Sequence, residues 1–199
     1  MTIESIVALA LFAFVSSITP GPNNLMILAS GLNFGLVRSI PHLLGISLGF
    51  GIMVVGVGSG LHTVFTQYPW AYQMVRFLGA GYLLWMAWQL ARSSSPASDA
   101  PTTSQPLGFV GAAAFQWVNP KAWVMAITAA ATYLPTQAQP VHVIYLALVF
   151  MVVNLPCVAV WASFGSGLRQ VLQSPKKLRI FNGLMAAGLV ASLYPMLRN

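Results

Sequence analysis

The stretch IESIVALALFAFVSSITPGPNNLMILASGLNF, residues 3–34, is longer than one membrane span requires, and TPGPNN, residues 19–24, interrupts it. A spanning helix needs about 20 mostly apolar residues. The two prolines lack an amide hydrogen, so the carbonyls of Ser16 and Ile18 lose their helical partners. Because an unpaired carbonyl is costly in hydrocarbon, we expect a broken membrane helix whose break lines a cavity.

The composition of the whole chain also indicates an integral membrane protein. Of its 199 residues, 57% are hydrophobic and 6% are charged, whereas a soluble domain carries about 25% charged residues. This excludes a water-soluble globule and a disordered chain, and the single cysteine excludes a disulfide scaffold. The net charge of +7 comes from Lys and Arg at the ends of apolar segments, so we interpret it as an orientation signal and expect no nucleic-acid partner.

Six apolar segments are long enough to cross a membrane, which predicts an all-α protein surrounded by lipid. Residues 93–106 are rich in Ser, Pro and Thr and predict a flexible linker. The linker separates two three-helix units, 1–92 and 107–199. The expected spans are residues 3–34, 41–61, 70–91, 107–134, 141–168 and 178–197.

Matches between the two halves predict an internal repeat. With three spans in each half, homologous halves must be inverted in the membrane, as in many transporters. We therefore expect two inverted three-helix repeats, each with a broken first helix. The matches, all at an offset of 100 residues, are Thr19-Pro20 with Asn119-Pro120, His42 with His142, and Arg76 with Lys176.

Lys and Arg are distributed unevenly over the predicted loops. Six follow the odd-numbered spans and two lie on the other side. Because cytoplasmic loops carry the excess of positive charge, we expect both termini to be periplasmic. The six are Arg38, Arg92, Arg169, Lys176, Lys177 and Arg179, and the two are Arg76 and Arg198.

A second break is predicted within FQWVNPK, residues 115–121. Asn119 followed by Pro120 is the order found at a helix start, with Asn as the N-cap and Pro at the first helical position. Thr19-Pro20 offers the same pairing at the first break. Two half-helix N-termini would present free N–H groups and positive dipole ends, which bind anions.

Lys121 is the only Lys or Arg well inside a predicted span. A cation beside a helix N-terminus inside a membrane needs an anion, and a substrate carboxylate would supply one. The alternatives are a simple proline kink and a Lys121 that snorkels to the interface. For Asn154, an interhelical hydrogen bond is an alternative to a place in the cavity. The candidate substrate-binding residues are Thr19, Pro20, Gly21, Pro22, Asn23, Asn24, Gln116, Asn119, Pro120, Lys121 and Asn154.

These motifs resemble those of the LysE/RhtB family of bacterial amino-acid exporters over essentially the whole chain. The motifs are TPGPNN at 19–24, GISLGF at 45–50 and FQWVNPK at 115–121. Within that family the chain is most similar to exporters of cysteine and O-acetylserine. The resemblance implies efflux of small amino acids across the inner membrane, driven by the proton or potential gradient, and often a homodimer.

The source of energy stays open at this point. Glu4 and Asp99, the only carboxylates, lie outside the predicted membrane core, so they offer no intramembrane proton carrier. His42 and His142, near the ends of predicted spans, could titrate near neutral pH, with an interfacial role as the alternative. We expect no metal or cofactor: the shortage of carboxylates argues against a hard-cation exporter, and a redox carrier would need a second cysteine near Cys157. A non-amino-acid solute, a membrane enzyme and a packing scaffold are the alternative functions.

Glycines recur along the second predicted span and indicate close helix packing. Whether the helix partner lies in the same subunit or in a second copy is left open by the sequence. The glycines are Gly45, Gly49, Gly56 and Gly60.

Overall fold

The computed structural model describes residues 3–61, 67–92, 105–135, 137–172 and 174–194, and over these residues it is helical with no strand. Most of the expected linker, residues 93–104, lies outside the described residues. The first half contains α1 (Ile3–Ile18), α2 (Pro22–Phe34), a 3-10 turn (Val37–Ser39), α3 (Ile40–Gly56), a π-helical turn (Val57–Leu61) and α5 (Pro69–Arg92). The second half contains α6 (Phe109–Gln116), α7 (Pro120–Tyr133), α8 (Pro140–Val171) and α9 (Pro175–Ala191).

Proline marks where many of these helices begin. It occupies one of the first two positions of α2, α3, α7, α8 and α9. At a helix start the missing N–H costs nothing, and the fixed φ of proline suits the first turn. Pro156 differs because it lies inside α8, which continues through it for 32 residues in total.

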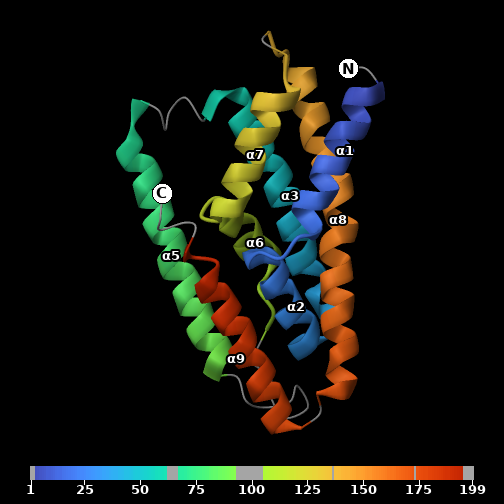
Figure 1. Cartoon of the computed structure of the whole chain (residues 1–199), viewed down its shortest axis with the longest axis vertical. Helices are drawn as coiled ribbons and strands as arrows, with labels where there is room; N and C mark the ends of the chain where they lie inside the picture. Colours follow the sequence, from blue (N-terminus) through green and yellow to red (C-terminus); the bar gives the residue numbers. More distant parts are fainter. Residues whose placement is uncertain (1–2, 62–66, 93–104, 136, 173, 195–199) are drawn as a thin grey trace.

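Two pairs of helices, α1–α2 and α6–α7, are each divided by a break. In Figure 1 both breaks lie near mid-height, and the two pairs run in opposite directions along the long axis. The axes of α1 and α2 differ by 57°. The long helix α8 packs along both α1 and α2, α3 packs against α6 and α8, and α5 pairs with α9.

The long helices fit a membrane protein. By length and hydropathy, Val37–Leu61 and Pro140–Arg169 can each cross a bilayer, and the bent α1–α2 pair qualifies when taken as one span. Over the described residues, α5, the α6–α7 pair and α9 do not meet this test of length and hydropathy. Two of these helices are short: α9 has 17 residues and α6 has 8. The six-span inverted arrangement therefore stays a prediction.

The glycine-rich face of α3 packs against α6 of the same chain. A Cβ on Gly45 would overlap the carbonyl oxygen of Phe109, and a Cβ on Gly49 would lie 2.5 Å from Cα of Ala113. These two glycines therefore bring the backbones of α3 and α6 into contact. Gly60 does not share this role, because it has a φ of 104° and no neighbour near its Cβ position.

Candidate functional site

The first break differs in detail from the sequence prediction. The N-cap of α2 is Gly21, in an extended conformation, and Pro22 stands at the helix start, so Thr19-Pro20 is not the capping pair. The Thr19 hydroxyl instead donates back to the carbonyl of Ser16 at 3.0 Å and closes α1. The correction has a local cause: with two prolines in four residues, Pro22 starts the helix while Pro20 keeps the preceding residue out of it.

Side chains satisfy the carbonyls at this break. Nε1 of Trp161 donates to the carbonyl of Ile18 at 3.1 Å. Nδ2 of Asn24 donates to the carbonyls of Ser17 and Thr19 at 2.8 and 2.7 Å. Asn24 therefore fixes the backbone conformation at the break. The sequence prediction identified Asn24 but not Trp161, because Trp161 lies 143 residues from the Ile18 carbonyl that it contacts.

The second break follows the sequence prediction. Asn119 is the N-cap of α7, its Oδ1 accepts from the backbone N–H of Lys121 at 3.1 Å, and Pro120 follows it. Nε1 of Trp123 donates to the carbonyl of Trp117 at 2.7 Å. Each break thus uses an indole N–H to satisfy a carbonyl that the interrupted helix leaves free.

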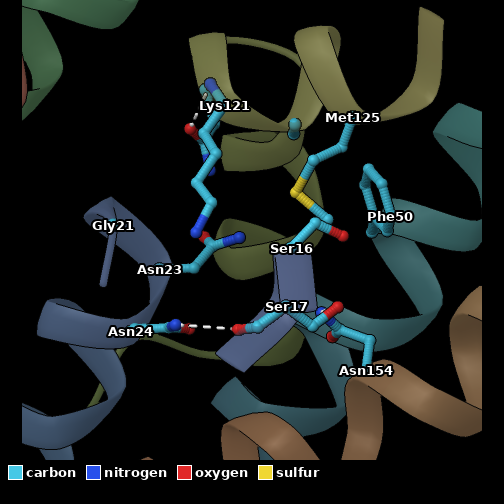
Figure 2. A pocket seen from close by; sticks show the side chains of 11 residues that line it. Ser16, Ser17, Gly21, Asn23, Asn24, Phe50, Lys121, Met125 and Asn154 are labelled. Atoms are coloured by element: carbon cyan, nitrogen blue, oxygen red, sulfur yellow. Dashed lines mark hydrogen bonds between the residues drawn. The ribbon is translucent and has the colours of Figure 1, made fainter. Parts of the chain in front are cut away.

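Lys121 joins the two breaks (Figure 2). Its Nζ lies 2.6 Å from the carbonyl oxygen of Thr19, 2.9 Å from the Thr19 hydroxyl and 3.4 Å from the carbonyl oxygen of Pro20. These carbonyls follow the C-terminus of α1, the negative end of its dipole, which favours a cation. Gly21 provides the space, because a Cβ there would lie 2.7 Å from Cδ of Lys121.

Two further side-chain bridges cross the site. Asn23 and the fully buried Gln116 exchange both amide hydrogen bonds, at 2.8 and 3.1 Å. Asn154 donates to Oγ of Ser17 at 3.1 Å and accepts from Oγ of Ser47 at 3.0 Å. The two roles considered for Asn154 are therefore both fulfilled, since it forms interhelical hydrogen bonds and also lines the pocket.

A small pocket lies between the breaks (Figure 2). Its volume of about 20 Å³ holds a water molecule but not an amino acid. Six of the candidate residues line it: Gly21, Asn23, Asn24, Asn119, Lys121 and Asn154. The other five do not: Thr19 and Pro20 contact Lys121, Gln116 contacts Asn23, and Pro22 and Pro120 start the helices.

Five lining residues were not predicted: Ser16, Ser17, Phe50, Ala122 and Met125. Local signals for three of them exist in the sequence. Ser16 and Ser17 stand just before the first break, and Met125 stands four residues after Lys121, on the same helix face. Phe50 has no such signal, because α3 brings it to the pocket only through packing.

His42 and His142 do not line this pocket. His42 in α3 is 1% exposed, and the described residues offer neither ring nitrogen a hydrogen-bond partner. Nδ1 of His142 accepts from the backbone N–H of Gln139 at 3.1 Å and so helps to cap α8. His142 therefore has a structural role at a helix end.

Comparisons with known proteins agree with the motifs. A family model described as LysE type translocator matches residues 14–191. The cysteine/O-acetylserine efflux protein of Klebsiella pneumoniae subsp. pneumoniae is 34% identical over 167 residues, which cover 83% of this chain and 84% of the relative. The protein of the same name from Salmonella paratyphi A is 32% identical over 131 residues, 66% of each chain. No solved structure matches the chain.

Proposed function

This chain belongs to the LysE type translocator family, and from that premise we propose that it exports small neutral amino acids across a bacterial inner membrane. Cysteine, O-acetylserine, threonine and homoserine are the substrates to test first. The proposed carrier has six spans in two inverted three-helix repeats, periplasmic termini and a homodimeric assembly. Substrate binds between the two helix breaks, near the middle of the membrane.

The contact of Lys121 with Thr19 is the observation that carries the proposal. An amino acid is a zwitterion, and the two sides of this contact complement its two charges. The Lys121 ammonium pairs with the substrate carboxylate. The carbonyl oxygens of Thr19 and Pro20, which now accept from Lys121, then accept from the substrate ammonium. Substrate binding thus replaces one set of charge-assisted hydrogen bonds by two.

The neighbouring polar groups supply the rest of the site. The N-termini of α2 and α7 point their positive dipole ends towards the breaks and favour the carboxylate. The Asn23 and Gln116 amides, paired with each other, are positioned to exchange that pairing for substrate. Asn24 has a different role, because both of its donor hydrogens already serve carbonyls of the break.

Transport requires the helices to separate, because a pocket of about 20 Å³ is smaller than an amino acid. The hydrogen bonds that cross the pocket can break when the helices separate. Lys121 with Thr19 and Asn23 with Gln116 are side-chain hydrogen bonds between the α1–α2 and α6–α7 pairs. The neutral Asn23–Gln116 bonds contribute about 1 kcal/mol each in net terms, and the bonds of the charged Lys121 about 1.5–3 kcal/mol, so we propose that both can be exchanged during opening. We propose alternating access through movement of one pair against the other.

Efflux from preloaded proteoliposomes tests the proposal. Labelled cysteine, O-acetylserine, threonine, homoserine, leucine and lysine are offered, with and without imposed pH and voltage gradients. We expect saturable efflux of small neutral amino acids by the wild type and no efflux by Lys121→Met. Lys177→Met, at an exposed lysine in the first turn of α9, is the matched control and retains transport.

The outcomes separate the proposed function from the proposed site. If the wild type exports none of the six amino acids, the function is wrong. If it exports one and Lys121→Met does so equally well, the function stands and Lys121 is removed from the site. Monodisperse elution of each variant in detergent shows that a loss of transport is not a loss of fold.

A further inference from the structure

Apolar side chains close the bundle between the pocket and one end of the molecule. From the two breaks, α1 and α7 extend to the end at which α1 begins (Figure 1). Buried side chains of α1, α3, α7 and α8 fill the space between these helices, among them Leu9, Met53, Ala126 and Phe150. A substrate in the pocket can therefore leave towards this end only when part of this packing separates.

Four aromatic rings form a continuous row within this packing. Phe50 lines the pocket, and its ring lies edge-on to that of Phe150, with centroids 5.3 Å apart. Phe150 is edge-on to Phe12 at 6.2 Å, and Phe12 is tilted against Tyr133 at 6.0 Å. Phe12 stands one turn before the pocket residue Ser16, on the same face of α1. The row therefore starts at the pocket and ends at Tyr133, the last residue of α7.

One exposed hydrogen bond holds the outer end of the row. The Tyr133 hydroxyl of α7 donates to the carbonyl oxygen of Ala8 in α1 at 3.2 Å. A carbonyl inside a helix also has the N–H group four residues later as a partner. Breaking the tyrosine contact therefore leaves no buried backbone group unpaired, and the hydroxyl can turn to water.

Contacts elsewhere in the bundle are of a different kind. Glycines bring helix backbones together there: a Cβ on Gly31 of α2 would overlap the carbonyl oxygen of Ala162 in α8. Neither α1 nor α7 contains a glycine, and the ring contact and hydrogen bond between them come from the side chains of Phe12 and Tyr133. Side chains can change rotamer, whereas backbone contacts separate only when whole helices move. The α1–α7 contact therefore opens more easily than the glycine contacts.

We propose that Phe12 and Tyr133 form a gate that closes the pocket towards the end of the bundle at which α1 begins. Phe150, which is 0% exposed, is the fixed surface against which Phe12 closes. When α7 moves away from α1, the Tyr133 hydrogen bond breaks, Phe12 leaves Phe150 and the pocket opens. The inference rests on the proposed function and adds to it where the pathway is closed. With periplasmic termini, this is the gate through which an exported amino acid leaves.

The reactivity of a cysteine in the pocket measures how often this gate is open. Ser16→Cys is made together with Cys157→Ser, which removes the one native cysteine. The thiol is labelled with 2-(trimethylammonium)ethyl methanethiosulfonate, a charged reagent that does not cross the membrane. Spheroplasts present one face of the membrane to the reagent and inverted vesicles present the other. Ile3→Cys, at an 80% exposed residue that begins α1, identifies the face on which the gate lies.

Both gate variants should raise the labelling rate of Ser16→Cys on that face. Tyr133→Phe removes only the hydroxyl, so we expect an increase of about two- to tenfold. Phe12→Ala removes both ring contacts of that residue, so we expect about tenfold or more. On the opposite face the rate should stay the same or fall, because a pocket open to one side is closed to the other.

Matched controls use the same residue types outside the gate. Phe14→Ala, at a half-exposed phenylalanine of α1, and Tyr68→Phe, at an exposed tyrosine before α5, should leave the labelling rate unchanged. If Phe12→Ala does not fold, Phe12→Leu makes a smaller change with the same expected direction.

The outcomes distinguish the gate from the proposed function. Unchanged labelling in folded Phe12 and Tyr133 variants overturns the gate, and so does an equal rise on both faces, which indicates a general loosening of the fold. Wild-type efflux is measured on the same protein in proteoliposomes. Normal efflux together with unchanged labelling overturns the gate alone, whereas absence of efflux of every amino acid offered overturns the proposed function.

Discussion

The carbonyl oxygen of Thr19 accepts a hydrogen bond from Nζ of Lys121 at 2.6 Å, although 102 residues separate the two in sequence. The contact places the lysine of the second break against the carbonyl end of α1. The carbonyls stabilise the ammonium through their partial negative charge, so the lysine is tolerated between helices without a carboxylate of the protein. The same contact leaves a cation and a set of carbonyl acceptors next to one pocket, and the following predictions test that arrangement.

Gly21→Ala should reduce transport more than stability. The new methyl group would lie 2.7 Å from Cδ of Lys121, and this flexible side chain moves away more easily than backbone does. We expect Nζ to leave the Thr19 carbonyl and the efflux rate to fall severalfold, with a thermal midpoint close to that of the wild type. Gly81→Ala is the control, because nothing lies within 4 Å of that added methyl group. Wild-type efflux by Gly21→Ala would contradict the position assigned to Lys121.

Asn119→Ala should destabilise the start of α7. The substitution removes the acceptor for the backbone N–H of Lys121, and loss of such a cap costs about 1 kcal/mol. We expect a lower thermal midpoint in detergent and slower efflux, because Lys121 follows the cap directly. Asn119→Ser keeps a capping oxygen and should restore most of the thermal midpoint and of the efflux rate. Equal effects of Ala and Ser would show that the cap is not the cause.

Exchanging the Asn23 and Gln116 amides should preserve their bridge. Asn23→Gln and Gln116→Asn each change the combined length of the pair by one methylene, so each single variant should transport more slowly than the wild type. The double variant restores the length and should recover efflux. A double-mutant cycle of stability measures the coupling, for which about 0.6 kcal/mol is typical of interhelical hydrogen bonds in membranes. Simple addition of the two losses would exclude direct coupling.

Gly165→Ala should separate α2 from α8. A Cβ at Gly165 would overlap the carbonyl oxygen of Leu28 and lie 3.1 Å from the backbone nitrogen of Leu32. Because backbone does not yield easily, we expect destabilisation of about 1–3 kcal/mol, seen as a lower thermal midpoint. Gly167→Ala in the same helix has no neighbour within 4 Å and should leave the midpoint unchanged or raise it. Similar effects of the two substitutions would contradict close packing at Gly165.

Features that depend on neighbouring residues were predictable from the sequence. The all-helical composition, both helix breaks and the Asn119-Pro120 cap follow from hydropathy, from proline geometry and from a side chain reaching its own helix start. The error at Thr19-Pro20 shows where local reasoning is insufficient. Either Pro20 or Pro22 could begin α2. The helix begins at Pro22, because Gly21 is extended and the Thr19 hydroxyl bonds back to the end of α1.

Partners that come from distant helices were decided by the tertiary structure alone. The sequence identified Lys121 as unusual and suggested an anion beside it, whereas the packing of α7 against the end of α1 provides the Thr19 carbonyl. Trp161 and Phe50 reach the site in the same way, from α8 and α3. Helix limits depend on hydrogen bonds within a few residues, which the sequence specifies directly. The identity of a contact across the bundle depends on how whole helices pack, and in this chain small residues such as Gly45, Gly49 and Gly165 set that packing.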